Sequence, residues 1–229
     1  MTLKLKLLMA GCAISISALA TAGSMGALNS EDAHPWSIIG SLGYTWYDGA
    51  YSGGITADVD AQNAIGDGQT ALGRFAVARD LWAYKKIHFG GEIGVQSGND
   101  FRLPIPQITL DEIGGVMTQA TIKPMLDFLA TATWQPMDSK PVFGIVKLGV
   151  AYRRMIIDDR VTFNDLSQAA FEVQAGLGMP ISEHATISLN YQGVFDGSTT
   201  YNVNTTASVG TVSNIPMQNG LFLSIGYRL

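Results

Sequence analysis

Three histidines, His34, His88 and His184, are the side chains in this sequence best suited to proton transfer near neutral pH. One of them ends the run Ser182-Glu183-His184, which has the residue types of a hydrolase triad. A nucleophile, a base and an acid must line up through side-chain hydrogen bonds, and three consecutive residues in one turn cannot do so. We therefore predict a polar turn here, no catalytic residues, and a protein that is not an enzyme.

Metal or thiol chemistry has two candidate positions, the acidic stretch Asp58–Gly68 and the single cysteine, Cys12. The acidic stretch superficially resembles a calcium loop, but Asn63 occupies the place of the required glycine and Gln69 that of the bidentate glutamate. We interpret it as a solvated acidic loop. One cysteine forms neither an intramolecular disulfide nor a cysteine-based zinc site. The sequence thus predicts no metal and no cofactor.

Ion pairing is the chemistry that the remaining charged residues support. Charged residues make up 14% of the 229 residues, against about 25% in soluble domains. The net charge of −5 provides no basic surface, which excludes nucleic-acid binding. Seven charged residues share one property, a place on the polar positions of alternating segments: Arg74, Glu92, Lys123, Asp127, Lys147, Glu172 and Arg228.

Eight segments with a period of two must position these charges. They span 36–46, 71–79, 87–95, 122–134, 142–152, 169–179, 185–195 and 221–229. In each segment every second position belongs to one set, and we call the set with the apolar residues the apolar parity. On the apolar parity only Arg79 is charged among 46 positions, whereas all seven charges above lie among the 38 positions of the opposite parity. A helix cannot keep a period of two over 13 residues, so we predict strands with one apolar and one polar face.

The connections between these segments alternate strictly between long and short. They contain 24, 7, 26, 7, 16, 5 and 25 residues in chain order. A soluble β-sandwich also alternates in hydrophobicity, but compact soluble domains seldom carry several long loops. Short periplasmic turns and long outer loops are typical of transmembrane barrels. The pattern therefore predicts an all-β fold, an eight-stranded antiparallel transmembrane up-and-down β-barrel.

Aromatic residues gather at the ends of the predicted strands rather than at their centres. Trp82 is predicted in a short turn, and the others lie at or near segment ends: Trp36, Trp46, Trp134, Tyr152 and Tyr227. Tryptophan and tyrosine favour the two membrane–water interfaces, because one part of each ring system is apolar and another is polar. We predict that these six residues form two aromatic girdles around the barrel.

The N-terminal segment 1–22 has the features of a secretory signal peptide. Lys4 and Lys6 precede the apolar run Leu7–Ala20, and Ala20-Thr21-Ala22 offers a cleavage site after Ala20 or Ala22. The rival interpretation is a transmembrane helix, but the run has 14 residues where about 20 are needed. Lipidation at Cys12 would leave a very short apolar region before the cut. We predict a signal peptide at 1–22 and one barrel domain at 23–229.

The C-terminal segment Gly220–Leu229 alternates up to an aromatic at Tyr227, as in strands that direct barrel assembly. With the export signal, the eight strands and the loop rhythm, residues 23–229 resemble the small outer-membrane β-barrel family of Gram-negative bacteria. That family includes the transmembrane domain of outer membrane protein A and the opacity-type surface antigens. The resemblance implies the cell outer membrane, contact with its lipid and lipopolysaccharide, and recognition by the barrel insertion machinery. Leu229 departs from the terminal Phe usual in the family.

Eight strands enclose an interior just wide enough for side chains to fill, so a broad diffusion pore is not expected. The nearly balanced inward charges are predicted to pair as a polar plug, and a gate in a narrow conduit is the alternative. The stretch 100–121 is unusually apolar for a loop and is expected to fold over the barrel mouth or to meet a partner.

Our hypothesis is an outer-membrane surface protein whose barrel anchors four long loops that contact an unknown surface ligand. The alternative is a narrow channel for small or hydrophobic solutes. An outer-membrane enzyme is less favoured, because such enzymes need a histidine near the outer rim, where none of the three is expected.

Overall fold

The computed structural model describes residues 36–47, 70–102, 119–135, 141–158, 162–197, 199, 201–204 and 209–229. The predicted signal peptide 1–22, the acidic stretch 58–68 and residues 103–118 of the apolar loop lie outside the described residues. No helix in the described ranges is long and apolar enough to cross a membrane.

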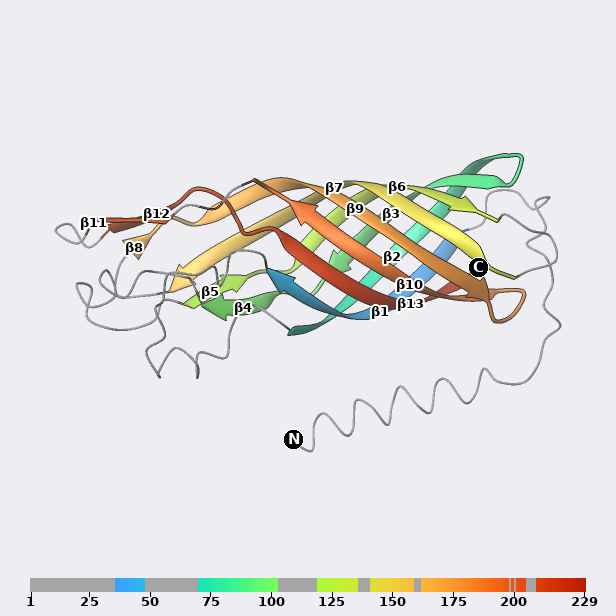
Figure 1. Cartoon of the computed structure of the whole chain (residues 1–229), viewed down its shortest axis with the longest axis horizontal. Coiled ribbons are helices and arrows are strands. Elements are labelled where there is room, and N and C mark those ends of the chain that lie inside the picture. The colour runs from blue at the N-terminus through green and yellow to red at the C-terminus, as the bar shows by residue number, and fades with distance from the viewer. Residues whose placement is uncertain are drawn as a thin grey trace, which may run out of the picture.

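Eight strands form a closed antiparallel barrel, as the alternation predicts (Figure 1). They are β1 Trp36–Tyr47, β2 Thr70–Tyr84, β3 Ile87–Gln96, β6 Met125–Trp134, β7 Phe143–Asp158, β9 Leu166–Pro180, β10 Ala185–Phe195 and β13 Gln218–Arg228. Each strand pairs with the next along the chain, and β13 pairs with β1 to close the circle. Closure removes the unpaired edges that a membrane does not tolerate. The predicted fold is confirmed.

Regular structure continues beyond the barrel at the end that carries the long connections. There β4 Asn99–Arg102 pairs with β5 Gln119–Ile122, and β5 pairs with the outer part of β7. A separate sheet contains β11 Tyr201–Asn204, β12 Val209–Val212 and β8 Thr162–Phe163. In Figure 1 these strands lie at the end of the molecule opposite the C-terminus. Parts of the predicted long loops are therefore strands.

The opposite end has tight turns, and one of them is shorter than expected. The sequence predicts a turn at 80–86, but β2 continues to Tyr84 and leaves only Lys85 and Lys86 between the strands. Lys85 has a positive φ of 53°, as a two-residue hairpin requires. A bulge between Asp80 and Trp82 shifts the register of β2 against β3. The prediction that Trp82 lies in a turn is wrong, because it belongs to β2.

The two faces of the barrel differ as the parity predicts. Outward residues such as Phe75, Phe128 and Leu189 are 55–58% exposed, whereas inward Leu129 is 3% exposed. An apolar outer face of this kind is stable against lipid and unfavourable against water. Trp36, Trp82, Trp134 and Tyr227 are exposed at the short-connection end, whereas Tyr152 is exposed and Trp46 half-buried toward the other end.

The orientation of the barrel can be tested by cysteine labelling. We expect Lys123→Cys, at the long-connection end, to react with a membrane-impermeant maleimide on intact cells, because long loops face outward. Glu183→Cys, in the turn between β9 and β10, should react only after the outer membrane is permeabilised. Signal cleavage would remove Cys12, the only natural cysteine, so the wild-type protein is the blank. The reverse labelling pattern would show an inverted barrel.

Candidate functional site: the ion-pair cluster in the barrel

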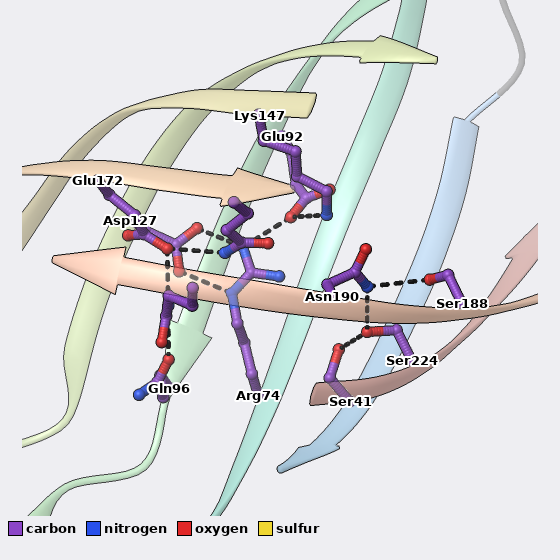
Figure 2. Close-up of polar contacts among 12 residues, drawn as sticks. Ser41, Arg74, Glu92, Gln96, Asp127, Lys147, Glu172, Ser188, Asn190 and Ser224 are labelled. Carbon is purple, nitrogen blue, oxygen red and sulfur yellow. Dashed lines mark hydrogen bonds and ion pairs between the residues drawn. The ribbon is translucent and has the colours of Figure 1, made fainter. Parts of the chain in front are cut away.

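Four charged side chains from four adjacent strands meet inside the barrel (Figure 2). Arg74 on β2 donates from Nε to Asp127 Oδ2 on β6 over 2.8 Å, and its Nη2 contacts Asp127 Oδ1. The same Nη2 lies 2.6 Å from Glu92 Oε1 on β3. Lys147 on β7 donates to Glu92 Oε2 and Oε1 over 2.7 and 2.9 Å. All four residues are at most 5% exposed, so they form a buried network, here called the ion-pair cluster.

Gly94 makes the link between Arg74 and Asp127 possible. It lies on β3, between the strands of these two residues, and is paired in register with Asp127. A Cβ at this position would lie 2.6 Å from Asp127 Oδ1 and 2.7 Å from the guanidinium carbon of Arg74. These atoms are the ends of the two paired side chains, so a Cβ at position 94 would push the guanidinium and the carboxylate away from their present positions and disturb the ion pair that crosses β3.

Glu172 on β9 is also buried, but its partners are amides rather than cations. Its Oε1 accepts hydrogen bonds of 2.7 Å from Gln174 Nε2 and Gln192 Nε2. Its Oε2 has no hydrogen-bond partner among the described residues. Gln192 also donates to Gln96 Oε1 and accepts from Gln218 Nε2, which extends the polar contacts across the barrel. In the middle of the barrel the described residues therefore place two buried cations, Arg74 and Lys147, beside three buried carboxylates, Glu92, Asp127 and Glu172.

A second polar group faces the cluster from β1, β10 and β13. The hydroxyls of Ser41 and Ser224 lie 2.8 Å apart. Asn190 Nδ2 donates to Ser224 Oγ over 3.1 Å and to Ser188 Oγ over 3.0 Å (Figure 2). Polar side chains thus project into the barrel from both walls, which is how an eight-stranded interior is filled.

One of the seven predicted lumen residues lies elsewhere. Lys123 is exposed, and its backbone N–H donates to Arg154 O over 2.9 Å. It lies with Pro124 in a break between β5 and β6, so the prediction that Lys123 faces the lumen is wrong. Proline cannot donate to the strand pairing, and the break interrupts the parity. Arg228 lies at the short-connection mouth, where Nη2 is 3.9 Å from Asp80 Oδ2.

A cavity of about 140 Å³ occupies the short-connection half of the barrel. Its lining extends from Glu92 and Lys147 at the ion-pair cluster to His184 and Arg228 near the mouth. His88 lines it too. The hydroxyl of Ser182, two residues before His184, accepts a hydrogen bond of 3.0 Å from Ala185 N within the turn. No group of three or more possible metal ligands occurs in the part of the chain that the structure describes.

The outer end of the barrel is closed by a buried arginine that the sequence analysis does not single out. Arg153 on β7 is fully buried, donates from Nη1 to Pro216 O over 3.0 Å, and forms an ion pair with Asp196. Residues 214–216, here called the cover segment, are also bound by Gln168 on β9. Its Nε2 donates to Asn214 Oδ1 over 2.7 Å, and its Oε1 accepts from Ile215 N over 3.1 Å. Burial raises the pKa of Asp196, and the Arg153 guanidinium offsets part of that rise.

Arg153 was missed for a simple reason. The predicted strand ends at Tyr152, because Arg154 then places a charge on the apolar parity. The inward positions Arg153, Met155 and Ile157 nevertheless remain buried in β7. Ala151, Arg153, Met155 and Ile157 occupy every second position without a break. This regular spacing is the sequence signal that could have predicted a strand continuing beyond Tyr152.

Known structures share this architecture. The Neisserial surface protein A, NspA, matches with a TM-score of 0.50 and 10% identity over 86% of this chain and 100% of that chain. The chain has the fold of the small outer-membrane β-barrels. Ail, the attachment invasion locus protein of Yersinia pestis, matches with a TM-score of 0.47 and 12% identity over 86% and 97% of the two chains. The N-terminal barrel domain of Pseudomonas aeruginosa OprF matches at 0.39 and 9% over 86% and 100%.

The sequence matches no protein-family model and no curated protein. At 10% identity the likeness to NspA shows the fold. The apolar outer face of this barrel agrees with a lipid environment, and together they place the protein in an outer membrane.

Proposed function

We propose that the protein is an outer-membrane surface protein whose barrel is an anchor and whose outer strands and loops bind a partner at the cell surface. The observation that carries the proposal is the filling of the barrel. The ion-pair cluster occupies its middle, and Ile215, Met155 and Val194 are completely buried at its outer end. A filled barrel supports anchoring rather than diffusion of solutes.

The strands beyond the barrel are a second observation that supports the proposal. β7 continues to Asp158 and pairs there with β5, while β12 pairs with β8 in a separate sheet. Ordered strands hold surface residues in fixed positions, which lowers the entropic cost of binding a partner. Outer-membrane lipid, lipopolysaccharide and the barrel insertion machinery, reached through β13, are the further partners that we propose.

The proposal can be tested with a trimmed variant. Replacing residues 199–212 with a short Gly-Ser linker removes β11 and β12 but keeps Asn214, Ile215 and Pro216, which cover the barrel mouth. We expect the variant to fold and to lose adherence of producing cells to one another, to an epithelial monolayer or to glass. Lys123→Cys labelling in both backgrounds verifies equal surface amounts. Unchanged adherence on all three surfaces would contradict a binding role for this sheet.

A narrow channel is the second candidate, and the cavity of about 140 Å³ is the observation that favours it. We expect the purified protein in planar bilayers to show no reproducible conductance, because Arg153 and its cover segment close the outer end. A general porin inserted by the same procedure verifies that the assay detects open barrels. Reproducible conductance steps would contradict the anchor and favour the channel.

A further inference from the structure

A groove of about 590 Å³ crosses the outer face of β1, β2, β3 and β6 near the short-connection end. Its lining includes the large side chains Trp36, Leu81, Trp82, Ile93 and Phe128. Gly91 and Ala130 also line it. The large side chains point outward, so the groove lies on the face that contacts lipid and outside the lumen. Of the ion-pair cluster only Glu92, on β3, also borders it.

The residue sizes in neighbouring rows explain the depth of the groove. Arg79, Gly91 and Ala130 are paired in register across β2, β3 and β6, and the last two are small. A Cβ at Gly91 would meet no atom within 4 Å. The row toward the outer end contains Ile93 and Phe128. A shallow channel therefore runs between two rows of large side chains.

The β2 bulge completes the wall on the other side. Without the register shift between Asp80 and Trp82, an even-numbered residue of β2 such as Trp82 would point inward. With the shift, Trp82 is 55% exposed and stacks on Phe89 with ring centroids 5.2 Å apart. The bulge thus places an indole at the membrane–water interface beside the groove.

Arg79 provides the polar end of the groove. Its guanidinium lies 5.2 Å from the centre of the Trp36 ring, which orients it on the outer face. No carboxylate within the described ranges forms an ion pair with Arg79, and the adjacent Asp80 faces Arg228 instead. Exposed Lys85 and Lys86 follow in the turn and add positive charge at this end. A guanidinium at a membrane interface favours an anionic oxygen group, above all a phosphate.

We propose that this groove binds an anionic glycerophospholipid of the periplasmic leaflet, with its phosphate at Arg79 and one acyl chain across Gly91 and Ala130. The inference rests on the outer-membrane placement, since short turns mark the periplasmic side. Trp36, Arg79, Gly91 and Ala130 are paired in register across β1, β2, β3 and β6, so the cation lies directly beside the apolar channel. A phospholipid likewise presents its anionic phosphate next to its acyl chains. A soluble anion would leave the apolar channel unused, and a neutral lipid would leave Arg79 without a counter-ion.

The test uses the full protein folded in mild detergent, titrated with phosphatidylglycerol or phosphatidylcholine and observed by native mass spectrometry. We expect one phosphatidylglycerol to be retained by the wild-type protein in preference to phosphatidylcholine. Arg79→Gln should weaken phosphatidylglycerol retention about tenfold, because a charge-assisted phosphate contact is lost. Gly91→Leu should weaken retention of either lipid, because the side chain fills the channel.

Gly40 on β1 provides the matched control. A Cβ there also meets no atom within 4 Å, but Gly40 does not line the groove. Gly40→Leu should therefore retain phosphatidylglycerol like the wild-type protein. Equal retention by Gly91→Leu and wild type, or an equal loss in Gly40→Leu, would overturn the site.

Folding is read separately from the gel shift between unheated and boiled samples. If the wild-type protein gave no heat-sensitive compact band and did not insert into bilayers, the outer-membrane proposal itself would fail. If all variants folded and inserted but showed no lipid preference, the groove proposal alone would fail.

Discussion

Replacing Arg74 with Met is expected to lower the free energy of unfolding in bilayers by about 3–5 kcal/mol, the cost of removing one partner from a buried ion pair. Asp127 would lose the hydrogen bonds from Arg74 Nε and Nη2, and Glu92 would keep only Lys147. The measurement is urea unfolding in phospholipid vesicles, followed by tryptophan fluorescence and by the gel shift of unheated samples.

Glu172→Gln is the matched control for this prediction, because it also changes a buried charged residue. Its carboxylate contacts only the amides of Gln174 and Gln192 among the described residues, so no ion pair is lost. We expect a change within about 1 kcal/mol, since a Gln oxygen can accept the same hydrogen bonds. An equal loss in Arg74→Met and Glu172→Gln would contradict a specific role for the ion pairs.

A double variant, Arg74→Met with Asp127→Asn, distinguishes the loss of the ion pair from the loss of the two individual side chains. Asp127→Asn alone should cost about 1–3 kcal/mol, because a charge-assisted contact with Arg74 is replaced by a weaker one. Combined with Arg74→Met, it removes the carboxylate that Arg74→Met leaves buried without its partner. The double variant should therefore be more stable than Arg74→Met alone. Additive losses would show that the two side chains do not interact.

The barrel could be predicted from the sequence because alternate positions along each strand face two different environments, lipid and lumen, and each environment restricts charged residues in its own way. A lipid-facing position tolerates few charges, and only Arg79 breaks that rule among the predicted outward positions. An inward position can hold a charge if another strand provides its partner. Alternation thus revealed the eight strands and placed Arg74, Glu92, Asp127 and Lys147 on the inner face, where the structure brings them together.

The remaining features depend on geometry that parity does not contain. Pro124 breaks the alternation before β6, and alternation alone therefore predicts the wrong environment for Lys123. The bulge beside Asp80 reverses the face of Trp82. Arg153 binds backbone carbonyls of residues 215 and 216, whose position depends on how a long connection returns to the barrel. Partner identity across strands likewise depends on the stagger of the barrel, which the sequence of one strand does not specify.

The second large effect is expected on the outer face of β6. Phe128→Arg should lower the free energy of unfolding in bilayers by about 2–4 kcal/mol, the cost of a cationic side chain near the membrane midplane. Phe128 is 55% exposed and paired in register with Ile93 and Val150, both outward and apolar. The measurement is the same urea titration in vesicles, with the amount of inserted protein read from the heat-sensitive gel band.

Two glutamine variants, Phe128→Gln and Leu129→Gln, test which face of β6 contacts lipid, independently of how hydrophobic the replaced residue is. Leu129 is as apolar as its neighbour but only 3% exposed, and it is paired in register with Glu92, whose side chain is in the polar lumen. Leu129→Gln therefore places an amide among groups that can hydrogen-bond with it, whereas Phe128→Gln places one in lipid that cannot. We expect Phe128→Gln to weaken insertion more than Leu129→Gln. If Phe128→Gln were harmless while Leu129→Gln abolished insertion, β6 would be turned over in the membrane, and the carboxylate of Asp127 would then face lipid instead of Arg74.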